Sequence, residues 1–125
     1  MVFDTDVLVW GIRGHPGAVR AIDEAESREL SAVTYMELLR GARNAKEVRD
    51  IRALLRRSGF RMLPVTERIS DSAVALMEML ALKTGLGPAD ALIFETAMVE
   101  GLVLCSGKEK HFRDVPGLKS QVFRP

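Results

Sequence analysis

The chain has 125 residues, of which 47% are apolar and 28% charged, and its formal net charge is +1. This balance is typical of one globular domain over residues 1–125 and excludes a disordered polymer or a strongly basic nucleic-acid binder. The lone cysteine, Cys105, excludes an internal disulfide, and two histidines make a structural zinc site unexpected. Because acids interrupt the N-terminal apolar run and no run reaches the length of a membrane helix, we expect a cytoplasmic protein without a membrane partner.

Short apolar segments alternate with amphipathic ones along the chain. Residues 1–10 are predicted to form a buried strand that carries Asp4 near its end. Further strands are expected over 29–33, 60–65, 102–105 and, as a short fifth, 120–124. Helices are expected over 18–27, 34–42, 46–59, 70–85 and 85–101. This alternation predicts an α/β fold in which helices cover both faces of a parallel sheet of four to five strands.

Acidic side chains are expected at the carboxyl edge of that sheet, where open α/β sheets bind their ligands. Asp4 ends the first strand, and Glu37 lies in the helix that follows the second. Asp90 lies in the first turn of the helix before the fourth strand, and residues 106–108 lie just beyond that strand. The topology therefore predicts that these residues meet at one rim.

Each of the three carboxylates also has a purely structural interpretation. Asp4 is a candidate cap for the next helix, although Asp6 is the better placed for that role. Glu37 stands three residues after Thr34, which is the spacing of a capping box with Thr34 as the N-cap. Asp90 is favoured in a first helical turn by the helix dipole alone. Against these alternatives, all three acids lie in apolar segments, where an unpaired charge is costly.

Other residues near these segments receive weaker predictions. Glu95 and Glu100 follow Asp90 on the same helix, but helical spacing turns them elsewhere, so we expect both to be solvated. His15 and His111 have polar surroundings and are expected at the surface rather than as catalytic bases. Three carboxylates without a catalytic histidine favour a site for Mg²⁺ or Mn²⁺, which take oxygen ligands and support phosphate ester hydrolysis.

Basic residues follow Glu37 and extend through the next predicted helix. Arg40 and Arg43 are candidates for contact with the phosphate backbone of a nucleic acid, and the alternative is an ordinary solvated helix face. Lys108 belongs to a second basic group close to the predicted rim.

Four segments together resemble the motifs of PIN-domain ribonucleases and, more narrowly, the VapC-type toxins of prokaryotic toxin–antitoxin pairs. They are FDTDVLVW, TYMELLRGA, GPADALIFETA and LVLCSGKEKHF, and they span nearly the whole chain in family order. The resemblance implies a three-layer α/β/α sandwich and a Mg²⁺- or Mn²⁺-dependent endoribonuclease. It assigns Asp4, Glu37 and Asp90 as the metal-binding and catalytic acids. It further implies a homodimer, a VapB-like antitoxin that covers the site, and operator DNA bound only through that antitoxin.

The chain departs from the family pattern after the fourth strand. Many relatives carry Asn or a fourth acid two residues after the Ser or Thr that follows this strand, and here Lys108 stands two residues after Ser106. A second metal is therefore in doubt. Our hypothesis is that the three acids bind one ion, that Thr5 and Ser106 orient water or phosphate, and that Lys108 binds phosphate oxygens.

Two other functions compete with this hypothesis. The Asp-x-Asp opening at Asp4 and Asp6 also fits haloacid dehalogenase-like phosphatases, in which the first Asp attacks phosphorus, although the later acid pair of that family is missing. The second is a catalytically decayed module that binds only an antitoxin.

Overall fold

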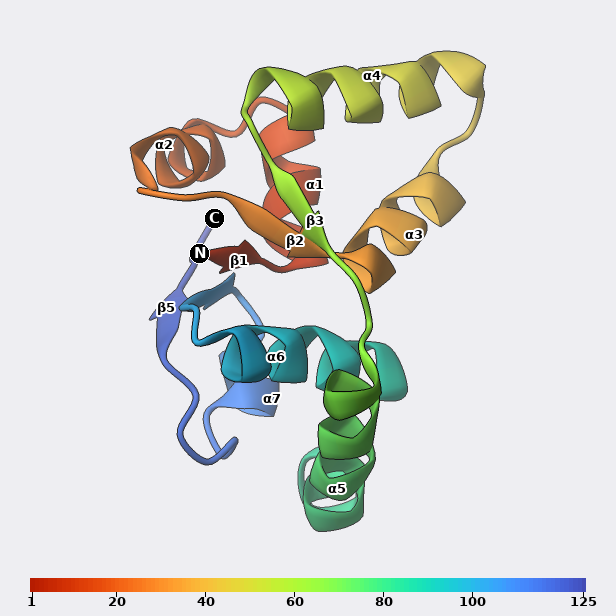
Figure 1. The fold of residues 1–125 in the computed structure, drawn as a ribbon. Coiled ribbons are helices and arrows are strands. Elements are labelled where there is room, and N and C mark those ends of the chain that lie inside the picture. Colours follow the sequence, from red (N-terminus) through yellow and green to blue (C-terminus); the bar gives the residue numbers. More distant parts are fainter.

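The computed structural model describes residues 1–125 as one parallel sheet with helices on both faces (Figure 1). The strands, in the spatial order β3-β2-β1-β4-β5, are β1 (Val2–Phe3), β2 (Glu29–Ser31), β3 (Arg61–Leu63), β4 (Leu104–Ser106) and β5 (Ser120–Val122). The helices are α1 (Thr5–Ile12), α2 (Pro16–Glu24), α3 (Ala32–Gly41), α4 (Ala45–Arg57), α5 (Glu67–Thr84), α6 (Pro88–Glu100) and α7 (Glu109–Phe112).

The short strands divide the apolar interior into two cores, one on each face of the sheet. Val2 and Leu104 point into the core formed with α5, α6 and α7. Their neighbours Phe3 and Cys105 point into the opposite core, formed with α1, α2 and α4. This alternation follows from the period of two along a strand. Figure 1 shows the two groups of helices on either side of the sheet, with α3 at the carboxyl end of strand β2. The predicted three-layer α/β/α fold is confirmed.

The first predicted strand is wrong beyond its first residues. Only Val2 and Phe3 are extended, and the apolar run after Asp4 forms α1 instead of continuing the strand. Asp4 has extended backbone angles, φ −68° and ψ 160°, and its side chain accepts a hydrogen bond from the Thr5 N–H. Asp4 is thus the N-cap that we expected Asp6 to provide. A period of two and a helical face are hard to distinguish in so short and apolar a run.

Two further expectations about helices are corrected. The N-cap of α3 is Ser31, whose side chain accepts from the Val33 N–H, so Thr34 lies inside the helix and forms no capping box with Glu37. Glu95 is buried rather than solvated, and this burial raises its pKa. Glu100 is exposed as expected. Helix α6 is apolar nearly all round because it lies between the sheet and α5, which leaves little of it for solvent.

Cys105 lies in β4, between β1 and β5, and is fully buried, as expected for a free thiol in an apolar strand. Burial raises its pKa to about 11, with a smaller contribution from the nearby Asp6 and Asp4 charges.

Length and hydropathy exclude every helix of the fold as a membrane-spanning segment.

Candidate active site

Asp4 stands at the carboxyl end of β1, between the strand and α1. Its Oδ1 accepts from the Thr5 N–H at 2.7 Å, and its Oδ2 accepts from the Ser106 hydroxyl at 2.7 Å. The residue is fully buried. Burial raises the pKa of Asp4 to about 6, although the Lys108 ammonium and the Ser106 hydroxyl act in the opposite direction. Burial therefore disfavours the ionised form of Asp4, and its hydrogen bonds and the nearby ammonium offset only part of this cost.

Glu37 reaches the same rim from α3 through a threonine. The Thr5 hydroxyl donates to Glu37 Oε1 at 2.6 Å, and the Thr34 hydroxyl lies 3.2 Å from the Thr5 hydroxyl. A hydroxyl has one proton, so the consistent arrangement has Thr34 donating to Thr5 and Thr5 donating to Glu37. The first residue of α1 is thus bonded to both acids, to Asp4 through its N–H and to Glu37 through its hydroxyl.

Asp90 is held from the other side by two nitrogen donors. It follows the Gly87 N-cap in the first turn of α6. Its Oδ1 accepts from Lys108 Nζ at 2.8 Å, and its Oδ2 lies 3.2 Å from His111 Nδ1. Burial alone would lower the pKa of Lys108, but the carboxylates of Asp4, Asp90 and Asp6 outweigh it and raise this pKa.

The loop after β4 connects the two sides. Ser106 Oγ donates to Asp4 and accepts from the Lys108 N–H at 3.0 Å. Asp6 Oδ2 accepts from the Gly107 N–H at 2.9 Å, which ties this loop to α1. A Cβ atom at Gly107 would lie 2.8 Å from that Asp6 oxygen and 3.1 Å from the Phe123 carbonyl oxygen, so a larger residue here would displace the Asp6 carboxylate from this bond.

The fold brings most of the sequence-predicted site residues into one hydrogen-bonded network. It runs through Glu37, Thr5, Asp4, Ser106, Lys108 and Asp90. The two arginines are separate from it. Arg40 is exposed and makes no ion pair, and Arg43 is paired with Glu47 at 2.8 Å on the surface.

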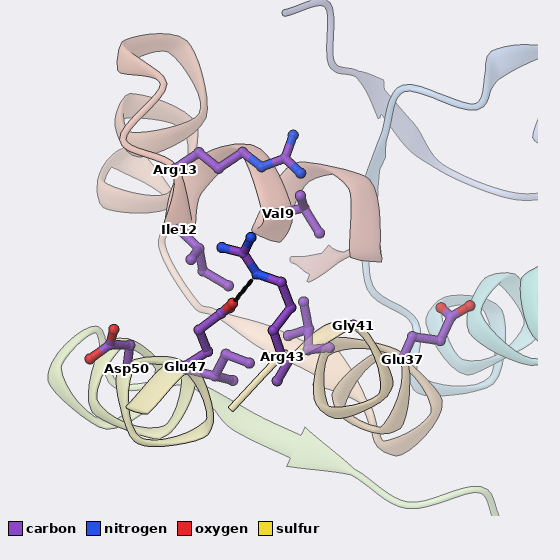
Figure 2. A pocket seen from close by; sticks show the side chains of 11 residues that line it. Val9, Ile12, Arg13, Glu37, Gly41, Arg43, Glu47 and Asp50 are labelled. Carbon is purple, nitrogen blue, oxygen red and sulfur yellow. Dashed lines mark hydrogen bonds and ion pairs between the residues drawn. The ribbon is translucent and has the colours of Figure 1, made fainter. Parts of the chain in front are cut away.

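A groove of about 550 Å³ lies beside the network, between α1, α3 and α4. Its apolar lining includes Val9, Ile12, Leu38 and Ile51. Figure 2 shows the Arg43–Glu47 pair across the groove, and Glu37 at its border with the carboxylate turned away from that pair. The network and the groove therefore share Glu37 as a common edge.

Sequence reasoning missed the contact of His111 with Asp90. His111 is partly buried beside Lys108 rather than a free surface residue, because the one-turn helix α7 follows Lys108 directly. The three-residue spacing between Lys108 and His111 was an available signal, since residues three apart share a helix face. Asp6 was considered as a helix cap and as part of an Asp-x-Asp motif, but its bond to the Gly107 N–H joins residues 101 positions apart, which no local pattern reveals.

The donor chemistry of this network fits a hard divalent cation, but the side-chain arrangement is built around an ammonium. Asp4, Glu37 and Asp90 offer only oxygen ligands, as Mg²⁺ or Mn²⁺ requires. No group of three or more acidic, histidine or cysteine side chains is close enough to hold a metal ion as arranged. The Asp90 carboxylate instead contacts Lys108 and His111.

Comparison with known protein families places these residues in context. The PIN domain family model matches residues 1–118, which include every residue of the network. The chain belongs to the PIN domain family. The haloacid dehalogenase-like alternative loses its basis, since the PIN match includes the Asp4 segment on which it depended.

Solved structures agree with this assignment. A chain of a toxin–antitoxin complex from Klebsiella pneumoniae is 28% identical, with a TM-score of 0.79 over 94% of this chain and 93% of that one. DNA-bound VapBC from Salmonella typhimurium is 24% identical, with a TM-score of 0.80 over 97% and 96%. VapBC2 from Rickettsia felis, bound to a promoter DNA fragment, is 19% identical, with a TM-score of 0.80 over 99% and 100%. The last two likenesses concern the fold.

A search of curated protein sequences finds no match. The resemblance to PIN domains, predicted from the four sequence motifs, is nevertheless confirmed by the family model, and the solved structures share the fold.

Proposed function

We propose that this PIN-domain protein is the toxin of a VapBC-type toxin–antitoxin pair and a Mg²⁺- or Mn²⁺-dependent endoribonuclease. The observation that carries the proposal is the network that connects Asp4, Glu37 and Asp90 at one rim of the sheet. PIN domains are generally nucleases, and solved structures similar to this chain are toxin–antitoxin complexes.

In this proposal Asp4, Glu37 and Asp90 hold the divalent ion at the rim. Such an ion lowers the pKa of a bound water and offsets charge on a phosphodiester. Thr5 positions Glu37 through its 2.6 Å hydrogen bond, and Ser106 positions Asp4 through its 2.7 Å hydrogen bond. Lys108, once free of Asp90, is within the rim to bind a phosphate oxygen as a point charge.

The exposed arginines supply RNA contacts outside the network. Arg40 is free to approach a phosphate, whereas Arg43 must first release Glu47, a surface pair that costs little to break. Such contacts position a backbone without reading its sequence. The chain's small net charge makes this local supply of positive charge necessary.

The groove beside Glu37 is the proposed site for a segment of the antitoxin. Its apolar lining and its edge at Glu37 suit an amphipathic helix that covers the network as it binds. The homodimer, the cytoplasmic location and the indirect contact with operator DNA remain predictions from the family resemblance.

The decisive experiment incubates antitoxin-free protein with total cellular RNA in Mg²⁺, in Mn²⁺ and in EDTA. We expect discrete products that require metal and disappear in Asp4→Asn and Asp90→Asn. The matched control is Asp71→Asn, which removes an exposed carboxylate on α5. This control should cleave like the wild type.

Three results would contradict the nuclease assignment. Products that persist in EDTA would exclude a metal-dependent reaction, and full activity of Asp4→Asn would exclude the network as the active site. Normal antitoxin binding with neither products nor metal binding would indicate the decayed binding module. Circular dichroism of each variant separates lost chemistry from lost folding.

The antitoxin site is tested by placing a charge in the groove. Ile12→Asp should abolish co-purification with the co-expressed antitoxin, because Ile12 lines the apolar groove. Val65→Asp is the control, since Val65 is equally exposed, at 37% against 38%, but lies outside the groove. Equal loss in both variants, or in neither, would exclude the groove as the docking site.

A further inference from the structure

Lys108 carries a positive charge into the centre of an acidic rim. Its ammonium contacts Asp90 Oδ1 at 2.8 Å, and the side chains of Lys108 and Asp90 are 34% and 13% exposed. The second oxygen of Asp90 is engaged by His111. Both oxygens of this carboxylate are therefore occupied by donors of the chain itself.

The backbone holds Lys108 in this place as well. Its N–H donates to Ser106 Oγ, the same atom that donates to Asp4. The Gly107 N–H donates to Asp6, which fixes the preceding peptide. Lys108 thus starts from an anchored backbone, and the charges of Asp4, Asp6 and Asp90 all favour its ammonium. An ammonium and a divalent cation compete for the same kind of oxygen site.

We propose that Lys108 is a built-in cation that holds Asp90 in the metal-free protein, and that a divalent ion gains Asp90 only by displacing this ammonium. The inference rests on the proposed metal-dependent function and extends it. Lys108 is here a positioning residue that lowers the affinity for metal. Its flexible stem and partial exposure let the displaced ammonium turn toward solvent or toward a phosphate.

The first test measures Mn²⁺ binding to metal-free protein by calorimetry, with electron paramagnetic resonance counting bound Mn²⁺. Lys108→Met keeps the apolar stem and removes the charge, so we expect Mn²⁺ to bind roughly tenfold or more tightly. Lys110→Met is the control, because it removes the same charge from an exposed side chain without an ion pair. Its Mn²⁺ affinity should equal that of the wild type.

The second test needs no metal. In EDTA, we expect Lys108→Met to lower the melting temperature, because Asp90 loses its ammonium partner. Asp90→Asn should lower the melting temperature less in Lys108→Met than in the wild type, since the contact between the two residues is already absent and only the His111 contact of Asp90 is left to lose. Strictly additive effects of the two substitutions would overturn the proposal.

The outcomes separate this inference from the proposed function. Mn²⁺ binding that is no tighter in Lys108→Met than in the wild type overturns the displacement and leaves the metal-dependent nuclease standing. Tighter binding in Lys108→Met, without RNA cleavage by any form, supports the displacement and contradicts the nuclease. Absence of Mn²⁺ binding in the wild type and in Lys108→Met overturns both.

Discussion

The carboxylates at the rim of the sheet are stabilised in two different ways, one for Asp4 and Glu37 and another for Asp90. Asp4 and Glu37 are held by neutral donors, namely hydroxyls and a backbone N–H. Asp90 is held by an ammonium and an imidazole. Asp4 is the more deeply buried of the two aspartates and lacks a direct ion pair.

This difference shows how the protein stabilises buried carboxylates when no metal is bound. On the Asp4 side, burial destabilises the charged carboxylate and raises its pKa. Protonation of Asp4 therefore removes this electrostatic cost. On the Asp90 side, the chain provides its own counter-charge. A cation arriving at the rim therefore gains most from Asp4, whose charge has no direct cationic partner, and must compete for Asp90.

The largest expected effect concerns the stability of the Asp4 side against pH. Because the pKa of Asp4 is raised from 3.8 to about 6 in the folded state, the folded state binds the proton more tightly than the unfolded state. Stability then falls as the pH rises from about 4 to 6, by up to about 3 kcal/mol. Urea denaturation in EDTA should show this loss in the wild type relative to Asp4→Asn.

Asparagine suits this comparison because it is a good N-cap and cannot be charged. At neutral pH, Asp4→Asn should be at least as stable as the wild type. A variant that loses stability in parallel with the wild type across this range would show that Asp4 titrates normally and that its burial has no electrostatic cost.

A smaller effect of opposite sign is expected on the Asp90 side. Asp90→Asn leaves the Lys108 ammonium without its ion pair, so stability at neutral pH should fall by about 1–2 kcal/mol in EDTA. Chemical denaturation at low and high NaCl is the measurement. The difference from the wild type should shrink in salt, because the pair is partly exposed. A stabilised Asp90→Asn would make the two sides electrostatically alike.

The neutral hydrogen bonds of the Asp4 side should contribute less. Thr5→Val keeps the side-chain shape but removes the donor to Glu37, for an expected loss of about 1 kcal/mol. Under the proposed function, the variant should also raise the metal concentration needed for half-maximal cleavage, because Glu37 is no longer oriented. Unchanged stability together with an unchanged metal requirement would remove Thr5 from the site.

The smallest effect is expected outside the rim. Arg43→Met breaks a surface ion pair with Glu47 in which the arginine side chain is 86% exposed, so its change in stability should fall within measurement error. The same denaturation series provides the measurement. A loss as large as that of Asp90→Asn would show that burial is not what distinguishes the rim from the surface.

Sequence alone was sufficient for the alternation of strands and helices, because hydrophobic periodicity directly reflects which face is buried. It also indicated that Asp4, Glu37 and Asp90 approach one rim, and the topology accounts for this. The end of the first strand was not predictable in this way, since Val7 and Leu8 are buried whether they lie on a strand or on a helix.

Contacts that depend on how separate elements meet could not be derived from local patterns. The burial of Glu95 follows from the packing of α6 between α5 and the sheet, which helical spacing alone does not specify. The pairing of Lys108 and His111 with Asp90 depends on the path of the loop after β4. The position of Lys108 in the motif was visible, but its partner was not.

The single thiol, which lies in the interior strand β4, is a built-in probe of how often the folded chain opens. Cys105 is fully enclosed, and its pKa of about 11 keeps it protonated and unreactive at neutral pH. A thiol reagent can modify the chain only after β4 has separated from the neighbouring elements. The labelling rate thus reports how often the interior is exposed, without any engineered probe.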